Sequence, residues 1–116
     1  YATPGSGMYK VVDGEPVGSV GFWPREWRGE QIYEVGWSVL PAAQGRGYAS
    51  EGMRLLLDVI RVDGSRRYVH AFPSVDNGPS NGICRKLGFT LLQTLEFEYP
   101  KGSFMQCNDW QLDLFG

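Results

Sequence analysis

The stretch Gln44-Gly45-Arg46-Gly47-Tyr48-Ala49 decides how this sequence is interpreted. It is followed directly by apolar residues at helical spacing, namely Met53, Leu55, Leu56, Leu57, Val59 and Ile60. This pattern predicts a glycine loop that opens a helix. Glycines let backbone amides approach a ligand, and the first turn of a helix offers unpaired N–H groups at the positive end of its dipole. The loop suits a phosphate, with Arg46 adding charge at its rim, but from this segment alone a plain structural turn is an equal alternative.

Length and composition predict one globular domain. The chain has 116 residues, 42% of them hydrophobic and 21% charged, with a formal net charge of -2. We therefore predict a single domain over residues 1–116 with a loop-like leader at 1–7, and no bulk attraction to nucleic acid or to an anionic membrane. Because residue 1 is Tyr1 and not Met, a piece of a longer protein is one interpretation.

Several classes of protein are disfavoured by what the sequence does not contain. No run approaches the roughly 18 apolar residues of a membrane span, and no signal-peptide pattern is present, so a cytoplasmic location is predicted. Cys84 and Cys107 lack CxxC partners, which indicates neither a zinc site nor a disulfide framework. No metal is expected.

Periodicity and turn residues predict the order β-β-β-α-β-α-β-β. A hairpin turns at Asp13-Gly14, and a charged loop with an exposed aromatic follows it at 24–30. The expected strands are 8–12, 16–23, 31–40, 67–72, 90–99 and 104–114. The expected helices are 48–62, with Gly64 as its stop, and 79–87, with Asn77 or Gly78 as its cap and Pro79 at its first position.

A second segment makes the phosphate interpretation specific. This segment contains Asn77-x-x-Ser80 and Lys86-Leu87-Gly88-Phe89. The glycine loop Gln44-x-x-Gly47-x-Ala49 resembles the acetyl-CoA pyrophosphate loop of the GNAT superfamily of N-acetyltransferases. The second segment resembles the conserved segment that follows this loop in the same superfamily. Glu34-Val35-Gly36-Trp37 before Pro41 resembles the subgroup that acetylates the N-termini of ribosomal proteins and its many relatives. The resemblance extends over roughly residues 8 to 115.

The resemblance implies an α+β fold, with a mixed, mostly antiparallel central sheet flanked by helices. Its two central parallel strands, 31–40 and 67–72, would part to admit the pantetheine arm of acetyl-CoA. The family fold usually begins with another strand and one or two helices, which help to wall the acceptor site and have no counterpart here. A truncated chain, a wall supplied by another copy or partner, and an unusually small domain are the alternatives.

The resemblance also implies the cofactor contacts. A strand bulge would place backbone groups of Ser38, Val39 and Leu40 against the pantetheine and the thioester carbonyl, where an amide stabilises a developing oxyanion. An ordinary strand end is the alternative for Val39 and Leu40. The pyrophosphate would lie on Gln44, Gly45, Arg46, Gly47, Tyr48 and Ala49. Asn77 would contact the cofactor or cap a helix, and Lys86 would reach its phosphates, unless it is an ordinary exposed helix charge.

Proton transfer needs a base for the amine and an acid for the leaving thiolate. Glu34 matches the subgroup's glutamate and is the predicted base, with a solvated charge or a partner for Arg25 or Arg28 as an equal alternative. Ser80 would donate to the thiolate or bind the pantetheine, or else serve only as a first-turn hydroxyl. Cys84 occupies the position of the family's usual tyrosine and is expected to pack in the core. His70 is a secondary base candidate.

The sequence thus predicts an acetyl-CoA-dependent enzyme that acetylates a primary amine, on a protein N-terminus or a small molecule, by direct transfer. A non-catalytic acyl-CoA-binding or assembly domain is the alternative. Trp23 and Trp27 would line a substrate pocket or a homodimer contact, whereas Trp37 is expected in the core.

Overall fold

The computed structural model describes residues 6–98 and 101–116. Within these residues six strands form one sheet in the order β1-β2-β3-β4-β6-β5, in which only β3 and β4 run parallel. The strands are β1 (Gly7–Asp13), β2 (Glu15–Trp27), β3 (Glu30–Val39), β4 (Tyr68–Ala71), β5 (Thr90–Glu98) and β6 (Phe104–Asp113). The helices are α1 (Tyr48–Asp63), α2 (Gly78–Lys86) and the short 3-10 helix η1 (Pro41–Ala43). The predicted α+β class and element order are confirmed.

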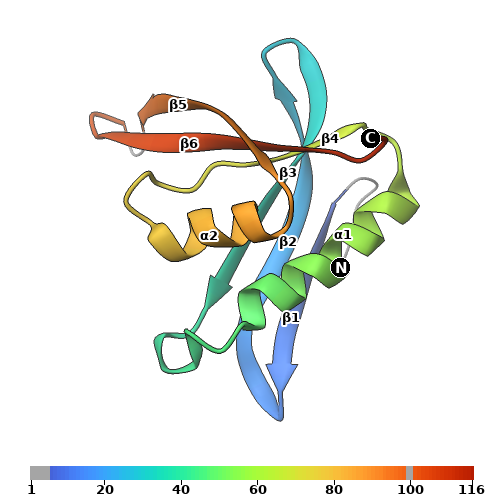
Figure 1. Cartoon of the computed structure of the whole chain (residues 1–116), viewed down its shortest axis with the longest axis vertical. Helices are drawn as coiled ribbons and strands as arrows, with labels where there is room; N and C mark the ends of the chain where they lie inside the picture. Colours follow the sequence, from blue (N-terminus) through green and yellow to red (C-terminus); the bar gives the residue numbers. More distant parts are fainter. Residues whose placement is uncertain (1–5, 99–100) are drawn as a thin grey trace.

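Both long helices lie on the same face of the sheet (Figure 1). Because side chains alternate along a strand, every second residue of β2 and β3 points toward α1. Helix α1 packs against them with apolar residues spaced three or four apart. The resulting core includes Val20, Phe22, Tyr33, Val35, Met53, Leu56 and Ile60, all buried. Within 6–98 and 101–116 no helix covers the opposite face, which is called the open face below.

The predicted loop at 24–30 is wrong. Strand β2 continues to Trp27 and β3 starts at Glu30, so that only Arg28 and Gly29 form the turn, with φ of 53° and 81°. Two consecutive positive φ values are typical of the tight hairpin turn that matches strand twist. The charged residues and Pro24 suggested a loop, but Pro24 is paired with Tyr33 inside the ladder.

Most other boundaries differ from the prediction by one or two residues. The leader prediction is wrong at Gly7, which begins β1, and residues 1–5 lie outside the described part of the chain. The last residue of the predicted strand 90–99 is also outside it. Gly64 ends α1 as expected, with φ of 61° and its amide bonded to the Ile60 carbonyl.

The parallel strands part, as predicted. Strand β4 pairs with β3 only at Tyr33↔Val69 and Glu34↔His70, whereas β3 continues to Val39. The predicted bulge is wrong, because the β2–β3 register runs without a shift along its whole length. Unpaired backbone groups arise here from the divergence of β4 and not from an extra residue in β3.

Candidate active site

A cavity of about 280 Å³ lies where β3 and β4 part. Because side chains alternate along β3, its lining comes from both faces of the sheet: Glu34 and Gly36 face the open side, whereas Val35 and Trp37 face the helices. The remaining lining residues are Trp23, Ala71, Phe72, Pro73, Asn77 and Ser80. The predicted residues Glu34, Asn77 and Ser80 are therefore brought together at one cavity.

Backbone groups of β3 point into this opening. The Leu40 amide donates to the Val17 carbonyl on β2 at 2.8 Å. Since alternate residues of an antiparallel strand bond to the same neighbour, Ser38 and Leu40 face β2, while Trp37 and Val39 face the side of β4. Of the three predicted backbone contacts, only Val39 has the required direction. The sequence does not indicate the direction of the Trp37 backbone, because this direction depends on the strand register.

The glycine loop has the geometry of an anion site. Gly45 and Gly47 both have φ of 81°, and a Cβ added to either would meet nothing within 4 Å. Gly47 caps α1 without a side-chain bond, and the first helical bond runs from the Glu51 amide to the Gly47 carbonyl. The N–H groups of the first turn, Tyr48 and Ala49 included, therefore have no intrahelical partner. The residues present fit a phosphate.

Two side chains hold the loop in place. Gln44 donates its Nε2 to the Val39 carbonyl at 3.0 Å, which ties the loop to β3. The Tyr48 hydroxyl bonds to the Asp13 carboxylate, which joins the start of α1 to the end of β1. This bond, with partial burial, raises the pKa of Tyr48, and the nearby Arg46 opposes the rise. The Tyr48 side chain therefore helps to hold the loop, and its backbone amide lacks an intrahelical partner.

The start of α2 carries two of the predicted residues. Asn77 Oδ1 accepts the Ser80 amide at 3.1 Å, so its predicted cap is confirmed. Ser80 Oγ accepts a bond from Trp37 Nε1 at 3.2 Å, a contact that the sequence did not indicate. Lys86 is exposed in the last turn, about 9 Å along the helix from Ser80. The structure does not bring Lys86 to the cavity.

Glu34 lies at the open face and forms an ion pair. Its Oε1 is 2.7 Å from Arg25 Nη1, and its side chain is 20% exposed. Arg28, the other partner considered, donates instead to Gln93 at 3.3 Å. The contact with Arg25 is thus established, whereas the role of Glu34 as a base stays a prediction.

Cys84 is a core residue, as expected. It is completely buried, and burial raises the pKa of its thiol to about 12. It does not line the cavity.

His70 is also buried, and it does not line the cavity. Its Nδ1 lies 2.6 Å from Asp109 Oδ1, and its Nε2 lies 3.2 Å from Gln111 Nε2. Burial alone would raise the pKa of Asp109, but bonds with His70 and Gln93 outweigh it and hold that pKa below its usual value. The structure therefore does not bring His70, the secondary base candidate, to the cavity.

Asn81 is a buried residue that the sequence did not single out. Its Nδ2 donates to the carbonyls of Ser74 and Asn77, at 2.9 and 2.8 Å. Its Oδ1 accepts from Asn108 Nδ2 at 2.9 Å and from Trp110 Nε1 at 2.8 Å. These bonds fasten α2 to β6 and so fix the cavity wall. In the sequence, the only indication of this role of Asn81 is its position four residues after the capping residue Asn77.

Two further findings concern metals and membranes. Among the residues that the structure describes, no three His, Cys, Asp or Glu side chains cluster as metal ligands. In the same residues no helix has the length and apolar character needed to cross a bilayer.

A sheet whose parallel strands part beside a glycine-opened helix defines the acyl-CoA N-acyltransferase fold, and the comparisons with known proteins agree. Residues 2–90 match the model of the acetyltransferase (GNAT) domain. An uncharacterized N-acetyltransferase of Bacillus subtilis, YnaD, is 30% identical over 82 residues, which are 71% of this chain and 45% of YnaD. The chain belongs to the GNAT family.

Solved structures show the same fold. YncA, an acetyltransferase described with acetyl-CoA from Salmonella typhimurium, has a TM-score of 0.80 at 23% identity, over 95% of this chain and 65% of YncA. The ribosomal α-N-protein acetyltransferase RimL in complex with coenzyme A has a TM-score of 0.78 at 24% identity, over 93% of this chain and 62% of RimL. The chain thus spans about half of YnaD and under two thirds of each of these two structures.

Proposed function

We propose that the chain transfers the acetyl group of acetyl-CoA directly to a primary amine, on a protein N-terminus or a small molecule. The observation that carries this proposal is the cavity where β3 and β4 part. It joins Glu34 on the open face to Asn77 and Ser80 on the helix face. The glycine loop that fits a phosphate is tied to the end of the same strand, where Gln44 bonds to the Val39 carbonyl. An acyl donor and an acceptor could therefore meet from opposite sides of the sheet.

The cofactor would be held mainly by backbone groups. The amides at Gly45, Gly47, Tyr48 and Ala49 would bind the pyrophosphate, and Arg46 would add charge. Positive φ at both glycines, open space at their Cβ positions and unpaired first-turn amides support this assignment. YncA and RimL are described with acetyl-CoA and coenzyme A, which supports the same class of ligand.

Acetyl-CoA supplies the acetyl group as a reactive thioester. In the proposed mechanism Glu34 accepts the proton that the amine loses as its nitrogen bonds to the acetyl carbon. The amide of Trp37 or Val39, directed into the opening, would donate to the carbonyl oxygen as it gains charge. The Ser80 hydroxyl would donate a hydrogen bond to the departing thiolate, which then takes a proton from solvent, and Glu34 would release the amine's proton to solvent. Trp37 Nε1 occupies one lone pair of Ser80 Oγ, which leaves the hydroxyl proton for another partner.

Two observations favour a second candidate, a domain that binds acyl-CoA without catalysis. The Glu34 carboxylate is already ion-paired, and the family's tyrosine position holds the buried Cys84. Such a domain would bind the cofactor through the same loop. A homodimer and a cytoplasmic location stay predictions.

Thiol release over a panel of amines and N-terminal peptides tests the proposal. The chain is incubated with acetyl-CoA and each acceptor, and free coenzyme A and acetylated acceptor are both measured. Acceptor-dependent release that Glu34→Gln lowers by roughly 100-fold or more is expected for a general base. Binding of acetyl-CoA without release over the whole panel would favour the second candidate.

A further inference from the structure

We propose that Arg25 is a positioning residue that fixes the Glu34 carboxylate at the mouth of the cavity. The role rests on the function proposed above, because Glu34 is the base in that reaction. Arg25 Nη1 lies 2.7 Å from Glu34 Oε1. Arg25 does not line the cavity, whereas Glu34 does, so Arg25 would act through Glu34.

The Arg25 guanidinium is itself held by aromatic rings. Its Cζ lies 4.9 Å from the centroid of the Trp27 ring, 5.0 Å from that of Phe72 and 6.0 Å from that of Phe97. These rings come from β2, from the segment after β4 and from β5. A guanidinium over several ring faces gains a cation–π attraction with each. Arg25 is therefore fixed by parts of the chain that are distant in sequence.

The rings also pack against one another. The Trp27 and Phe72 centroids are 4.9 Å apart, Trp27 and Phe97 are 5.8 Å apart, and Phe72 and Phe97 are 5.7 Å apart. Phe72 lines the cavity as well. The ring contacts thus run without a break from Phe97, near the tip of the β5–β6 hairpin, to Phe72 at the cavity wall, and Arg25 lies against all three rings.

The ion pair between Arg25 and Glu34 fixes the position of the carboxylate more than it stabilises the fold. A surface ion pair usually adds little stability because two long side chains must be ordered for it. Here the rings already order Arg25, whose side chain is 33% exposed, so its guanidinium can hold one carboxylate oxygen at little further entropy cost. Within 6–98 and 101–116 the other oxygen of Glu34, Oε2, accepts no hydrogen bond. This oxygen is the one available to an incoming amine.

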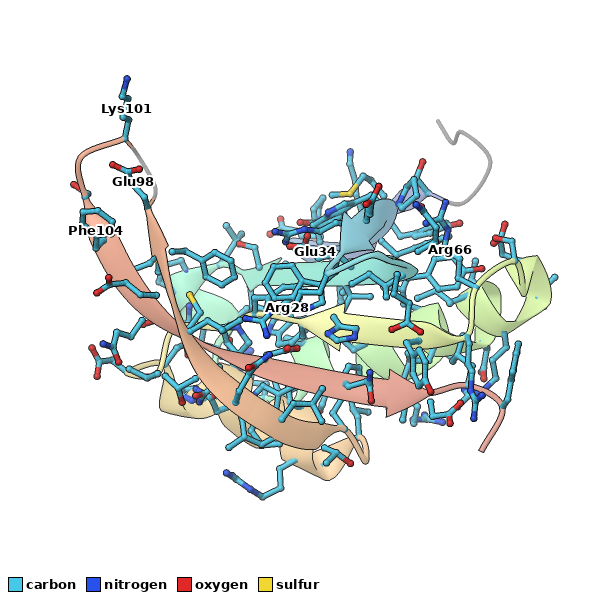
Figure 2. All side chains as sticks on the ribbon, turned by 90° about the horizontal axis from the view of Figure 1, so that it is seen from above. Arg28, Glu34, Arg66, Glu98, Lys101 and Phe104 are labelled. Carbon is cyan, nitrogen blue, oxygen red and sulfur yellow. The ribbon has the colours of Figure 1, made fainter. Side chains whose placement is uncertain are left out.

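Arg28 provides a matched control. Its Cζ lies 5.3 Å from the Trp27 centroid, so it shares a ring with Arg25. It donates to Gln93 and not to Glu34. In the view of Figure 2 the labels of Arg28 and Glu34 lie near the middle, while Glu98, Lys101 and Phe104 lie at the projecting tip of the β5–β6 hairpin. Arg28→Gln removes a guanidinium from the same ring without touching the base.

Turnover in a double-mutant cycle tests the role. Arg25→Gln should lower kcat by roughly 10-fold to 100-fold, as expected for a misplaced catalytic group, and leave the KM for acetyl-CoA unchanged. Arg25→Lys should recover part of the loss, and Arg28→Gln should cause none. In the Glu34→Gln background, Arg25→Gln should have no further effect. Equal losses in both backgrounds would overturn the proposal, because they would indicate a general structural role.

A second measurement needs no turnover and separates this proposal from the proposed function. The carboxylate carbon resonance of Glu34 is assigned by NMR from its loss in Glu34→Gln. It should move in Arg25→Gln and stay in place in Arg28→Gln, with backbone resonances outside the cluster unchanged. An unmoved resonance in Arg25→Gln would overturn the positioning of Glu34. A moved resonance in a chain that acetylates nothing would support the contact and count against the proposed function alone.

Discussion

Gly47 is the residue at which one substitution distinguishes a phosphate loop from a plain turn. It has φ of 81° and open space at its Cβ position. Gly29, in the β2–β3 turn, also has φ of 81° and open space. The two glycines lie beyond opposite ends of β3, a ten-residue strand about 30 Å long. Gly47→Glu and Gly29→Glu therefore impose the same backbone strain, but Gly47→Glu does so at the proposed phosphate loop and Gly29→Glu in the distant β2–β3 turn.

The expected magnitudes follow from this geometry. A side chain in the left-handed conformation costs about 1–2 kcal/mol, and both variants should lose that much stability. For a domain of this size each kcal/mol lowers Tm by roughly 4–8 °C. At Gly47 the new carboxylate would also repel a bound phosphate. At 4 Å this repulsion is about 1 kcal/mol in bulk water and about 4 kcal/mol near a protein surface. The Kd should therefore rise by roughly 5-fold to 1000-fold.

Titration calorimetry with coenzyme A measures the affinity, and a thermal melt measures the stability, so that the repulsion and the backbone strain are determined separately. Gly47→Glu should bind far more weakly than the parent chain, and Gly29→Glu should bind like the parent, while both melt at similarly lowered temperatures. Equal affinities for Gly47→Glu and Gly29→Glu would refute the assignment of the loop, whatever the affinity of the parent chain.

Three further predictions concern buried groups. Asn81→Leu leaves Trp110 Nε1 without its acceptor, and it should cost at least about 2 kcal/mol and lower Tm by roughly 8 °C or more in a thermal melt; an unchanged Tm would contradict the role of Asn81 in fastening α2. The pKa of Asp109 is lowered in the folded chain, so its contribution to stability is present above the ordinary value of 3.8 and is lost as the pH falls through the folded value. The free energy of unfolding in urea should therefore fall between pH 5 and pH 2, and it should fall less in Asp109→Asn than in the parent chain. Parallel plots of this free energy against pH for the two chains would contradict the lowered pKa of Asp109. Burial raises the thiol pKa of Cys84 to about 12 and also raises that of Cys107. Neither thiol should therefore react with Ellman's reagent at pH 8 until the chain unfolds. Rapid labelling of the folded chain would contradict the burial of these thiols.

The sequence predicted best where local chemistry decides the structure. Helix α1 was predicted from its apolar spacing and Gly64, and α2 from the capping residue Asn77 and the proline after it, because these signals act within a few residues. The glycine loop was predicted for the same reason. Two motifs in the right order then indicated the family before any contact was known.

The sequence failed where the outcome depends on distant residues. Charged residues and Pro24 predict a loop over 24–30, but pairing with β3 leaves only Arg28 and Gly29 in the turn. Whether Val39 or Ser38 faces the opening depends on strand register, which one sequence does not show. The ion pair of Glu34 and the aromatic rings around Arg25 join elements far apart in the chain, and no local pattern indicates them.

The central claim is that the cavity between β3 and β4 is a site of acetyl transfer to an amine. Its most direct test is mass spectrometry of a panel of amines and N-terminal peptides after incubation with acetyl-CoA and the parent chain, with Glu34→Gln in parallel. We predict an acetylated amine whose yield matches the coenzyme A released and falls by roughly 100-fold or more in Glu34→Gln. Tight binding of acetyl-CoA with no acetylated acceptor in the panel would contradict the claim.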